Sequence, residues 1–353
     1  MKKALLNGLC TIALLFASCG QQVEANQTKN ATTSKEQKST IVQSGHAAIG
    51  RLEHQTDDES APVVYFTREI TPESLIRVYN ALEWKPNGKV GIKISTGESA
   101  KTNHLRPQMI KDVVQLVNGT IVECNTAYGG NRANNVNHHK VAKERGYLDI
   151  AQFDLLDEED FIVLPVNGKV LKEDYVGSHF KNYGAFLVMS HFKGHQMAGF
   201  GGALKNLSIG FGSGTSVAKS GKAIIHSGGK SATHPWGGEQ IPFLEAMGEA
   251  AVAVCKAMDN GRGVAFINVM NRLSVDCDCN ANPTEPDMHD IGVLSSLDPL
   301  ALDQACIDLV WQASDSASLK QRVESRQGRH ILEYTDSLGF YKRIYRFVNL
   351  DEK

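Results

Sequence analysis

The stretch AFLVMS, residues 185–190, has the pattern of a strand that is buried on both faces. Continuous apolar runs of this length are typical of parallel sheets that are covered by helices on each side. Other short apolar runs alternate along the chain with segments of helical character. This alternation predicts an α/β fold with mostly parallel sheets flanked by helices, built as one large domain or as two lobes.

The expected elements can be placed along the chain by their patterns. Thr71 followed by Pro72 is typical of a helix start, because Thr caps the first amides and Pro suits the first turn. One expected helix begins at 71, and the others cover 106–117, 141–147, 243–258 and 300–311. The expected strands cover 63–66, 89–94, 120–124, 161–166 at a sheet edge, 185–190, 264–269 and 290–294.

Residues 1–19 have the features of a bacterial export signal. A basic start precedes an apolar run that is too short to span a bilayer, and small residues precede Cys19 as in a lipobox. These features predict an exported protein of the periplasm or outer membrane, anchored by a lipid on Cys19. The alternative is an ordinary cleaved signal in which Cys19 has no role. Residues 20–45 are polar and predict a flexible tether.

The remaining chain divides, in this interpretation, into an N-terminal lobe at 46–175 and a C-terminal lobe at 176–353. The formal net charge of −2 gives no basic excess for nucleic-acid binding. No later apolar run is long enough to span a membrane, so membrane contact is expected through the lipid anchor only. Cys255 and Cys306 lie in apolar helical runs and are predicted core residues.

The segment SHFKGHQMAGFGGALKN, residues 190–206, holds the densest polar chemistry and directly follows the buried strand. Open α/β sheets bind ligands at such strand ends. Glycines allow close backbone approach, lysines attract carboxylate or phosphate, and histidines bind metals or transfer protons. The alternative is a glycine-rich surface turn. The predicted catalytic residues are His195, Lys205, His191 and Lys93, and the predicted substrate-binding residues are Lys193, Gly201, Gly202 and Asn206.

A second candidate site is the run from Asp276 to Cys279. In an extended segment Cys277 and Cys279 would face one side and the two aspartates the other. Two thiolates form half of a site for a metal ion such as iron, nickel or zinc. A disulfide, a redox-active thiol pair and a structural role are the alternatives. The partners that would complete a metal site are His191, His195, His289 or Cys124.

Other polar residues give weaker signals. Asp298 precedes Pro299 and is predicted to cap a helix rather than to catalyse. Near Gly129 and Gly130, the polar side chains are Asn125, Arg132 and Asn134; His226 and His234 lie in a Gly/Ser stretch that forms either a mobile lid or a solvated loop.

Taken together, these motifs resemble the domain of unknown function 362 (DUF362) family over roughly residues 60–345. Many members carry a ferredoxin-type Cys-x-x-Cys-x-x-Cys insert, whereas this chain has no cysteine between His226 and Phe243. The resemblance therefore implies the base domain without its iron–sulfur insert. It is based on Lys93, Gly194–Leu207, Cys277–Cys279, Asp290–Asp303 and Glu333-Tyr334.

The run from His195 to Lys205 is also similar to a segment of the nickel-pincer lactate racemases. In those enzymes the histidine and lysine of the motif serve the cofactor and the substrate. The similarity implies that His195 would bind a cofactor or act as a base, and that Lys205 would contact substrate or cofactor.

The function that these features predict is a metal- or cofactor-dependent enzyme, either an oxidoreductase or an isomerase. It would perform redox or proton-transfer chemistry on a small anionic ligand. The first alternative is a non-catalytic binding protein for a small anion or metal, and the second is a purely structural chain.

Overall fold

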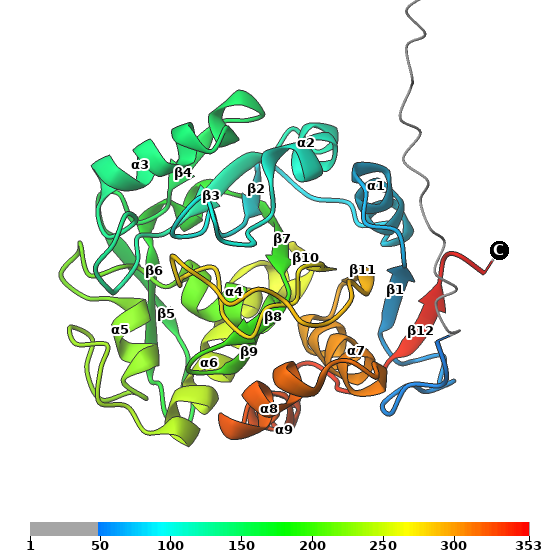
Figure 1. The fold of residues 1–353 in the computed structure, drawn as a ribbon. Coiled ribbons are helices and arrows are strands. Elements are labelled where there is room, and N and C mark those ends of the chain that lie inside the picture. Colours follow the sequence, from blue (N-terminus) through cyan, green and yellow to red (C-terminus); the bar gives the residue numbers. More distant parts are fainter. Residues whose placement is uncertain (1–48, 353) are drawn as a thin grey trace, which may run out of the picture. The chain divides into compact units, whose positions relative to one another are not determined.

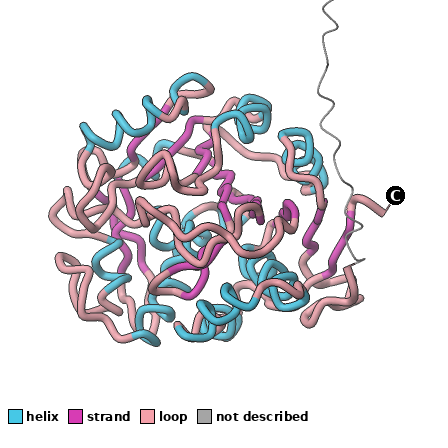
Figure 2. The backbone as a smooth tube through the Cα atoms, in the orientation of Figure 1, coloured by secondary structure: helices cyan, strands magenta, loops and turns pink. Residues whose placement is uncertain are grey.

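A mixed eight-stranded sheet organises the computed structural model, which describes residues 49–352 (Figures 1 and 2). Five neighbouring strands, from β10 to β4, run parallel to one another, whereas β11 is antiparallel to both of its neighbours. In spatial order the strands are β12 (Arg346–Asn349), β1 (Val63–Thr67), β11 (Gly292–Ser296), β10 (Val264–Met270), β7 (Ala185–His191), β2 (Val90–Lys93), β3 (Thr120–Glu123) and β4 (Phe153–Leu155).

Helices cover both faces of the sheet and enclose two apolar cores. One core lies under α1 (Pro72–Ala81) and α2 (Pro107–Leu116). The other lies under α4 (Ala203–Phe211), α6 (Gln240–Ala257), α7 (Pro299–Gln312) and α9 (His330–Ser337). The helices that complete the fold are α3 (Asn135–Glu144), α5 (Gly221–His226), α8 (Ala317–Ser325) and the 3-10 segments η1 (Tyr147–Asp149), η2 (Ser178–Asn182) and η3 (Asp259–Gly261).

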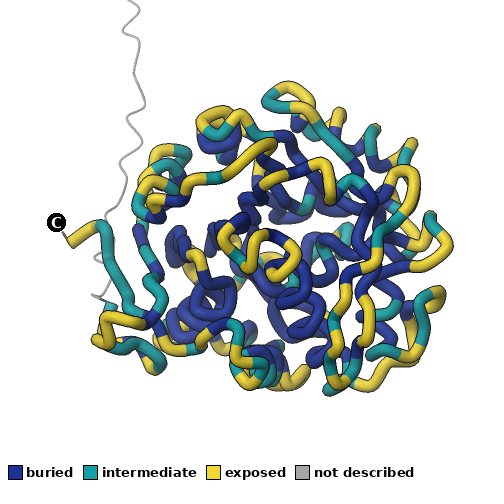
Figure 3. The backbone as a smooth tube through the Cα atoms, turned by 180° about the vertical axis from the view of Figure 1, so that it is seen from behind, coloured by how far each residue is buried: buried dark blue, intermediate teal, exposed yellow. Residues whose placement is uncertain are grey.

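The central strand β7 explains why the sheet needs helices on both sides. All its residues are buried, and Figure 3 shows buried backbone in dark blue through the interior of the described chain. Phe186 and Val188 belong to the core under α4 and α6, whereas Leu187 and Met189 belong to the core under α1 and α2. Side chains alternate between the two faces of a strand, so a continuous apolar run fills both cores.

Parallel pairing brings the carboxyl ends of β10, β7, β2 and β3 to one edge of the sheet. Lys93 of β2 pairs with Val188 of β7 and with Val122 of β3. Two hairpins lie outside the large sheet: β5 (Phe161–Pro165) with β6 (Glu173–Gly177), and β8 (Lys193–His195) with β9 (Gly199–Gly201). The β8–β9 hairpin follows β7 directly, so the glycine-rich segment is held at this same edge.

The α/β fold with a mostly parallel sheet is confirmed, and most expected elements are present within a few residues of their predicted bounds. The predicted helix at 141–147 was misplaced. The structure begins α3 at Asn135, because Asn134 caps it through a hydrogen bond from the Asn137 amide. Only His138, Val141 and Ala142 of this helix are buried, so its apolar pattern is weak. The strand expected at a sheet edge near 161–166 is β5, which pairs with β6 in a separate hairpin.

Strands from both sides of residue 175 belong to the one large sheet, since β2 pairs with β7. The predicted signal peptide, the tether at 20–45 and Cys19 lie outside the described residues. Among the residues that the structure describes, no helix combines the length and the apolar character needed to cross a bilayer.

Candidate functional site

A cavity of about 400 Å³ opens at the carboxyl edge of the parallel strands. Its wall combines the ends of β2, β3 and β7, helices α4 and α5, the loop after α5, the β8–β9 hairpin and the loop after β10. The structure thus brings together residues from distant parts of the sequence. The predicted site residues that line it are Lys93, His191, Lys193, His195, Gly202, Lys205, Asn206 and Cys279.

Gly201 and Cys277 lie beside the cavity lining. A Cβ atom added at Gly201 would lie 2.9 Å from Lys205 Cδ and 3.9 Å from Lys193 Nζ. The absence of a side chain at Gly201 therefore allows these two lysines to approach the same point.

The cavity wall carries an excess of positive charge. Five cationic side chains line it against two carboxylates, those of Glu123 and Asp278. Both carboxylates already form ion pairs with protein groups. The cations are Lys93, Arg132, Lys193, Lys205 and Lys222. An electropositive concavity with apolar walls attracts and holds anions.

Lys205 differs from the other cations of the wall. Within residues 49–352 its ammonium group has neither a hydrogen bond nor an ion pair to a protein atom, whereas the other four cations are engaged. Burial, with the added repulsion of Lys193, lowers the pKa of Lys205 from 10.5 to about 7. A lysine with this pKa exchanges its proton near neutral pH.

Lys93 is anchored rather than free. Its side chain is 1% exposed, and it donates to the Ile94 carbonyl at 2.7 Å and to Asn206 Oδ1 at 3.1 Å. Asn206 in turn donates to the carbonyls of Lys93 and Met189 and to Ser190 Oγ. Burial lowers the pKa of Lys93 to about 8. Asn206 therefore ties α4 to the ends of β2 and β7 and fixes the position of Lys93.

His191 and Lys193 hold Asp278 on one side of the cavity. Asp278 Oδ2 lies 3.0 Å from His191 Nδ1 and 3.3 Å from Lys193 Nζ. Burial opposes its ionisation, but the positive charges of His191 and Lys193 hold the pKa of Asp278 well below its ordinary 3.8. His191 Nε2 faces the Asn271 carbonyl at 2.7 Å, so both ring nitrogens are engaged. His191 thus positions the loop after β10.

Glu123 and Arg132 form a second polar network; the sequence patterns indicate Arg132 only as a weaker candidate and do not single out Glu123. Glu123 ends β3 and lies 3.3 Å from Arg132, which also contacts Glu98 and Tyr128. Burial opposes ionisation of Glu123, but His138 and Arg132 lower its pKa far below 4.5. Glu123 is the last residue of β3, as Lys93 is the last residue of the neighbouring β2, so the rule that ligands bind at strand ends could have found it. Lys222, on the short helix α5, gives no comparable signal.

Gly202 and Asp303 explain the start of α4. Asp303 of α7 accepts from the amides of Ala203 at 2.8 Å and Leu204 at 2.9 Å, and from Asn268 at 2.7 Å. A Cβ atom at Gly202 would lie 2.3 Å from Asp303 Oδ1. Burial raises the pKa of Asp303 to about 6. Asp303 is therefore a structural cap that fixes Lys205 and Asn206. Asp298 caps α7 as predicted, by accepting from Leu300 and Ala301.

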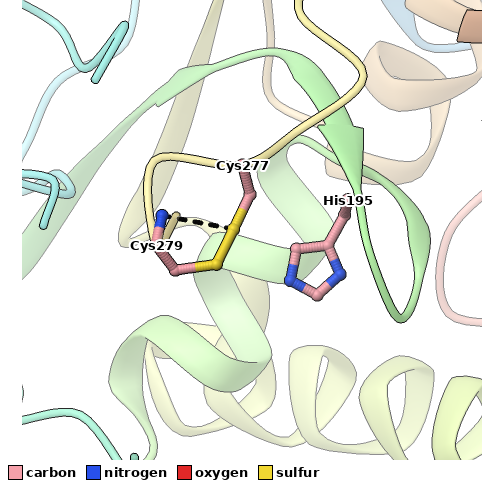
Figure 4. A group of neighbouring side chains, drawn as sticks. All are labelled: His195, Cys277 and Cys279. Atoms are coloured by element: carbon pink, nitrogen blue, oxygen red, sulfur yellow. Dashed lines mark hydrogen bonds between the residues drawn. A yellow bond between two sulfur atoms is a disulfide. The ribbon is translucent and has the colours of Figure 1, made fainter. Parts of the chain in front are cut away.

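The ring of His195 is oriented by the backbone of its own hairpin. His195 Nδ1 accepts from the amides of Ala198 at 2.8 Å and Met197 at 3.3 Å. A ring nitrogen that accepts two such bonds carries no proton, so the neutral ring bears its proton on Nε2. Burial and the nearby Lys205 charge lower the pKa of His195 well below 6.5, so the ring is neutral. Nε2 points toward Cys277 and Cys279 (Figure 4).

Cys277 and Cys279 are joined by a disulfide. The segment is not extended as expected, because Asn280 N donates to the Cys277 carbonyl and closes a turn. Asp278 contacts His191 and Lys193, whereas Asp276 contacts Thr284 and Arg322.

His195 is the histidine that lies with the two sulfurs, all within 4.8 Å of one another. His289 instead pairs with Asp315, and the Cys124 sulfur donates to the Phe211 carbonyl. A metal site formed by cysteine and histidine needs thiolate sulfurs and a ring nitrogen without a proton as its ligands. The disulfide and the protonated Nε2 of His195 do not provide this donor set, so a metal at Cys277 and Cys279 stays a prediction.

The model of the domain of unknown function named DUF362 matches residues 90–308, from β2 to α7. The chain belongs to the DUF362 family. The match includes all the lysines and carboxylates of the cavity wall, so the site lies in the DUF362 domain itself. No curated protein matches this DUF362 chain.

Two solved structures show limited similarity to the DUF362 chain. One is the lactate racemase apoprotein from Thermoanaerobacterium thermosaccharolyticum, at 15% identity and a TM-score of 0.35, covering 58% of this chain and 50% of that one. The other is a protein from Thermotoga maritima, at 11% identity and a TM-score of 0.37, covering 72% of this chain and 58% of that one. The chain thus spans about half the length of the racemase.

Proposed function

We propose that this protein is an enzyme that binds a small anionic substrate in the cavity and transfers a proton through Lys205. The observation that carries the proposal is the position of Lys205. It is the cavity cation without a protein partner among the described residues, and it lies in a wall with an excess of positive charge. An anion in this cavity can accept a hydrogen bond from Lys205, whose ammonium group has no protein acceptor among the described residues.

Lys193 and Lys205 would hold the charged group of the substrate, since both approach the same point over Gly201. With a pKa of about 7, Lys205 is present in both the ammonium and the amine form at neutral pH. It can therefore bind an anion when charged and accept a proton when neutral. Asn206, Asp303 and Asp278 position these lysines and contact no part of the substrate in this proposal. A cofactor that carries anionic groups would find the same electropositive wall.

The test combines binding with exchange. Wild-type protein is titrated calorimetrically with phosphate, acetate, lactate and malate, and the mixtures with the three carboxylates are then followed by proton NMR in deuterium oxide. We expect at least one of these carboxylates to bind and to exchange a carbon-bound proton for deuterium. Lys205→Met should weaken binding roughly 10- to 100-fold, since hydrogen bonds to charged groups contribute about 1.5–3 kcal/mol.

Two further variants interpret the result. Lys205→Arg keeps the charge but not the neutral amine, so it should bind the anion and fail to exchange the proton. Lys111→Met removes an exposed lysine of α2 and should match the wild type. Binding without exchange in the wild type would identify the non-catalytic anion-binding protein instead. Binding that is equal in wild type and Lys205→Met would contradict the proposed site.

We also propose that the protein is exported and anchored through a lipid on Cys19. The support is the lipobox-like sequence before Cys19. Fractionation of cells that express the full chain should place it with membranes, and Cys19→Ala should release it.

A further inference from the structure

The two sulfurs of the Cys277–Cys279 disulfide differ in access. Cys279 lines the cavity and is partly exposed, whereas Cys277 is 1% exposed and lies behind it. Thiol–disulfide exchange begins with attack of a thiolate along a path that reaches one sulfur. In this structure that path leads to Cys279.

The sulfur of Cys277 is the better-stabilised leaving group. Cys277 Sγ accepts a hydrogen bond from the Cys279 amide at 3.2 Å. The Nε2–H group of His195 faces the same disulfide, because Nδ1 is held by the amides of Met197 and Ala198 (Figure 4). The Cys279 amide thus donates to the sulfur on which negative charge develops when the disulfide opens, and the His195 N–H group faces the disulfide; a thiolate with such donors nearby leaves more readily.

The surroundings of Cys279 also favour a thiolate. Lys193 and Lys205 line the same cavity, and the carboxylate of Asp278 beside them is already paired with His191 and Lys193. Reactive cysteines are found in partly exposed, electropositive surroundings of this kind. The three other described cysteines, Cys124, Cys255 and Cys306, are buried and free.

We propose that Cys277 and Cys279 form a redox-active pair that accepts two electrons from a dithiol entering through the cavity. One thiolate of the dithiol attacks Cys279 Sγ, the sulfur–sulfur bond breaks, and its electron pair passes to Cys277. The second thiol of the donor then displaces Cys279 and closes the donor's own disulfide. The dithiol is oxidised, the protein disulfide becomes two thiols, and the two protons of the donor balance them. This activity does not depend on proton transfer by Lys205.

The experiment uses the full chain with dithiothreitol as the donor, under native conditions, with thiols counted by maleimide labelling and peptide mass spectrometry. We expect Cys277 and Cys279 to be reduced and labelled while the three buried cysteines stay unlabelled. Reduction only after unfolding would show a structural disulfide and would overturn the proposal. A stoichiometric metal held by the reduced pair, seen in elemental analysis, would overturn it in favour of a metal site.

Single variants test the asymmetry. Cys277→Ser leaves the accessible thiol of Cys279, which should react with glutathione disulfide at least tenfold faster than Cys277 does in Cys279→Ser. His195→Ala should shift the equilibrium with dithiothreitol toward the protein disulfide by about tenfold, because the thiolate loses one donor. His195→Gln, whose side-chain amide can place an N–H donor near the position of Nε2, should recover part of this shift, and His139→Ala on the half-exposed side of α3 should cause none. Equal reactivity of the two cysteines, or no effect of His195→Ala, would contradict the assigned roles.

Discussion

Lys205 shows how one side chain can conflict with the stability of the fold that holds it. An ammonium group that is held in a cavity without a protein partner costs free energy, because its lost solvation and the like charges around it are not offset. The neighbouring cations repel it further. Such uncompensated groups cluster at functional sites, where a ligand provides the missing partner.

This conflict predicts how pH affects stability at Lys205. The pKa is about 7 in the folded state and near 10.5 when unfolded, so the unfolded state binds more protons between these values. The loss of folding stability caused by Lys205 is therefore largest below pH 7, and it disappears as the pH rises toward 10.5. Lys205→Met should therefore be more stable than wild type in urea at pH 6, and the difference should shrink at pH 9. If Lys205→Met and wild type differed in stability by the same amount at pH 6 and pH 9, the charge on Lys205 would not be the cause. Lys205→Arg, which keeps its charge, should not gain this stability.

The sequence identified Lys205 but could not show that it lacks a partner. The motif after a buried strand predicted the lysines and histidines at one edge, and the structure places them around one cavity. Their ion pairs depend on Asp278 and Glu123, which come from other segments. Which cation is left unpaired is decided by these long-range contacts, and no local pattern reports them.

At the scale of elements, the start of α4 depends on a cap from another helix. Ordinary helices are capped by the residue before them, but Gly202 has no side chain and Asp303 of α7 takes that role. The Asp303 carboxylate occupies the space that a side chain at Gly202 would fill. The first turn of α4, with Lys205 and Asn206, is thereby attached to α7 and β10.

Removal of this cap should be strongly destabilising. Asp303→Ala leaves the amides of Ala203 and Leu204 and the side chain of Asn268 without their acceptor, at a cost of roughly 2–4 kcal/mol. Chemical denaturation of the variant measures the change in unfolding free energy. A loss below about 0.5 kcal/mol, the range of ordinary surface substitutions, would contradict the capping role.

Gly202→Ala tests the same contact from the other side. Its methyl group would meet Asp303 Oδ1, so the cap and the helix must separate, and we expect a lower denaturation midpoint together with weaker anion binding. Gly129→Ala is the matched control, since a Cβ atom there meets nothing within 4 Å. If Gly202→Ala and Gly129→Ala had equal effects, the contact between Asp303 and the start of α4 would not be the cause of the change.

The element boundaries that the sequence missed share one cause. Continuous apolar runs located β7 and β10, and an apolar helical run located α7; the residues of these elements are almost all buried. α3 is mostly exposed, and its start depends on a side-chain cap at Asn134 rather than on apolar spacing. Similarly, the turn at Cys277 is closed by backbone bonds and by Asp278 contacts, so an extended geometry was the wrong expectation.

At the scale of the whole molecule, the order of strands joins the two halves of the sequence. β2 and β3 lie beside β7 and β10 in one sheet, and β12 returns to pair with β1. The indole of Trp84 donates to the carbonyl of Arg262 at 2.9 Å, which adds a contact between the halves. A cut near residue 175 would expose the edge of β7 that β2 now covers.

This arrangement predicts that the described part of the chain unfolds as one unit. In a variant that keeps only Trp84, and in another that keeps only Trp311, fluorescence should report the same urea midpoint, because each tryptophan lies in a different half of the sequence. Far-ultraviolet circular dichroism of the wild type should coincide with both. Two lobes that fold separately would give two midpoints.

The cavity forms only when both halves of the sequence are folded together in one sheet, since Lys93 and Glu123 come from one half and Lys205 and Asp278 from the other. Opening of the sheet between β2 and β7 would therefore remove the site together with the fold.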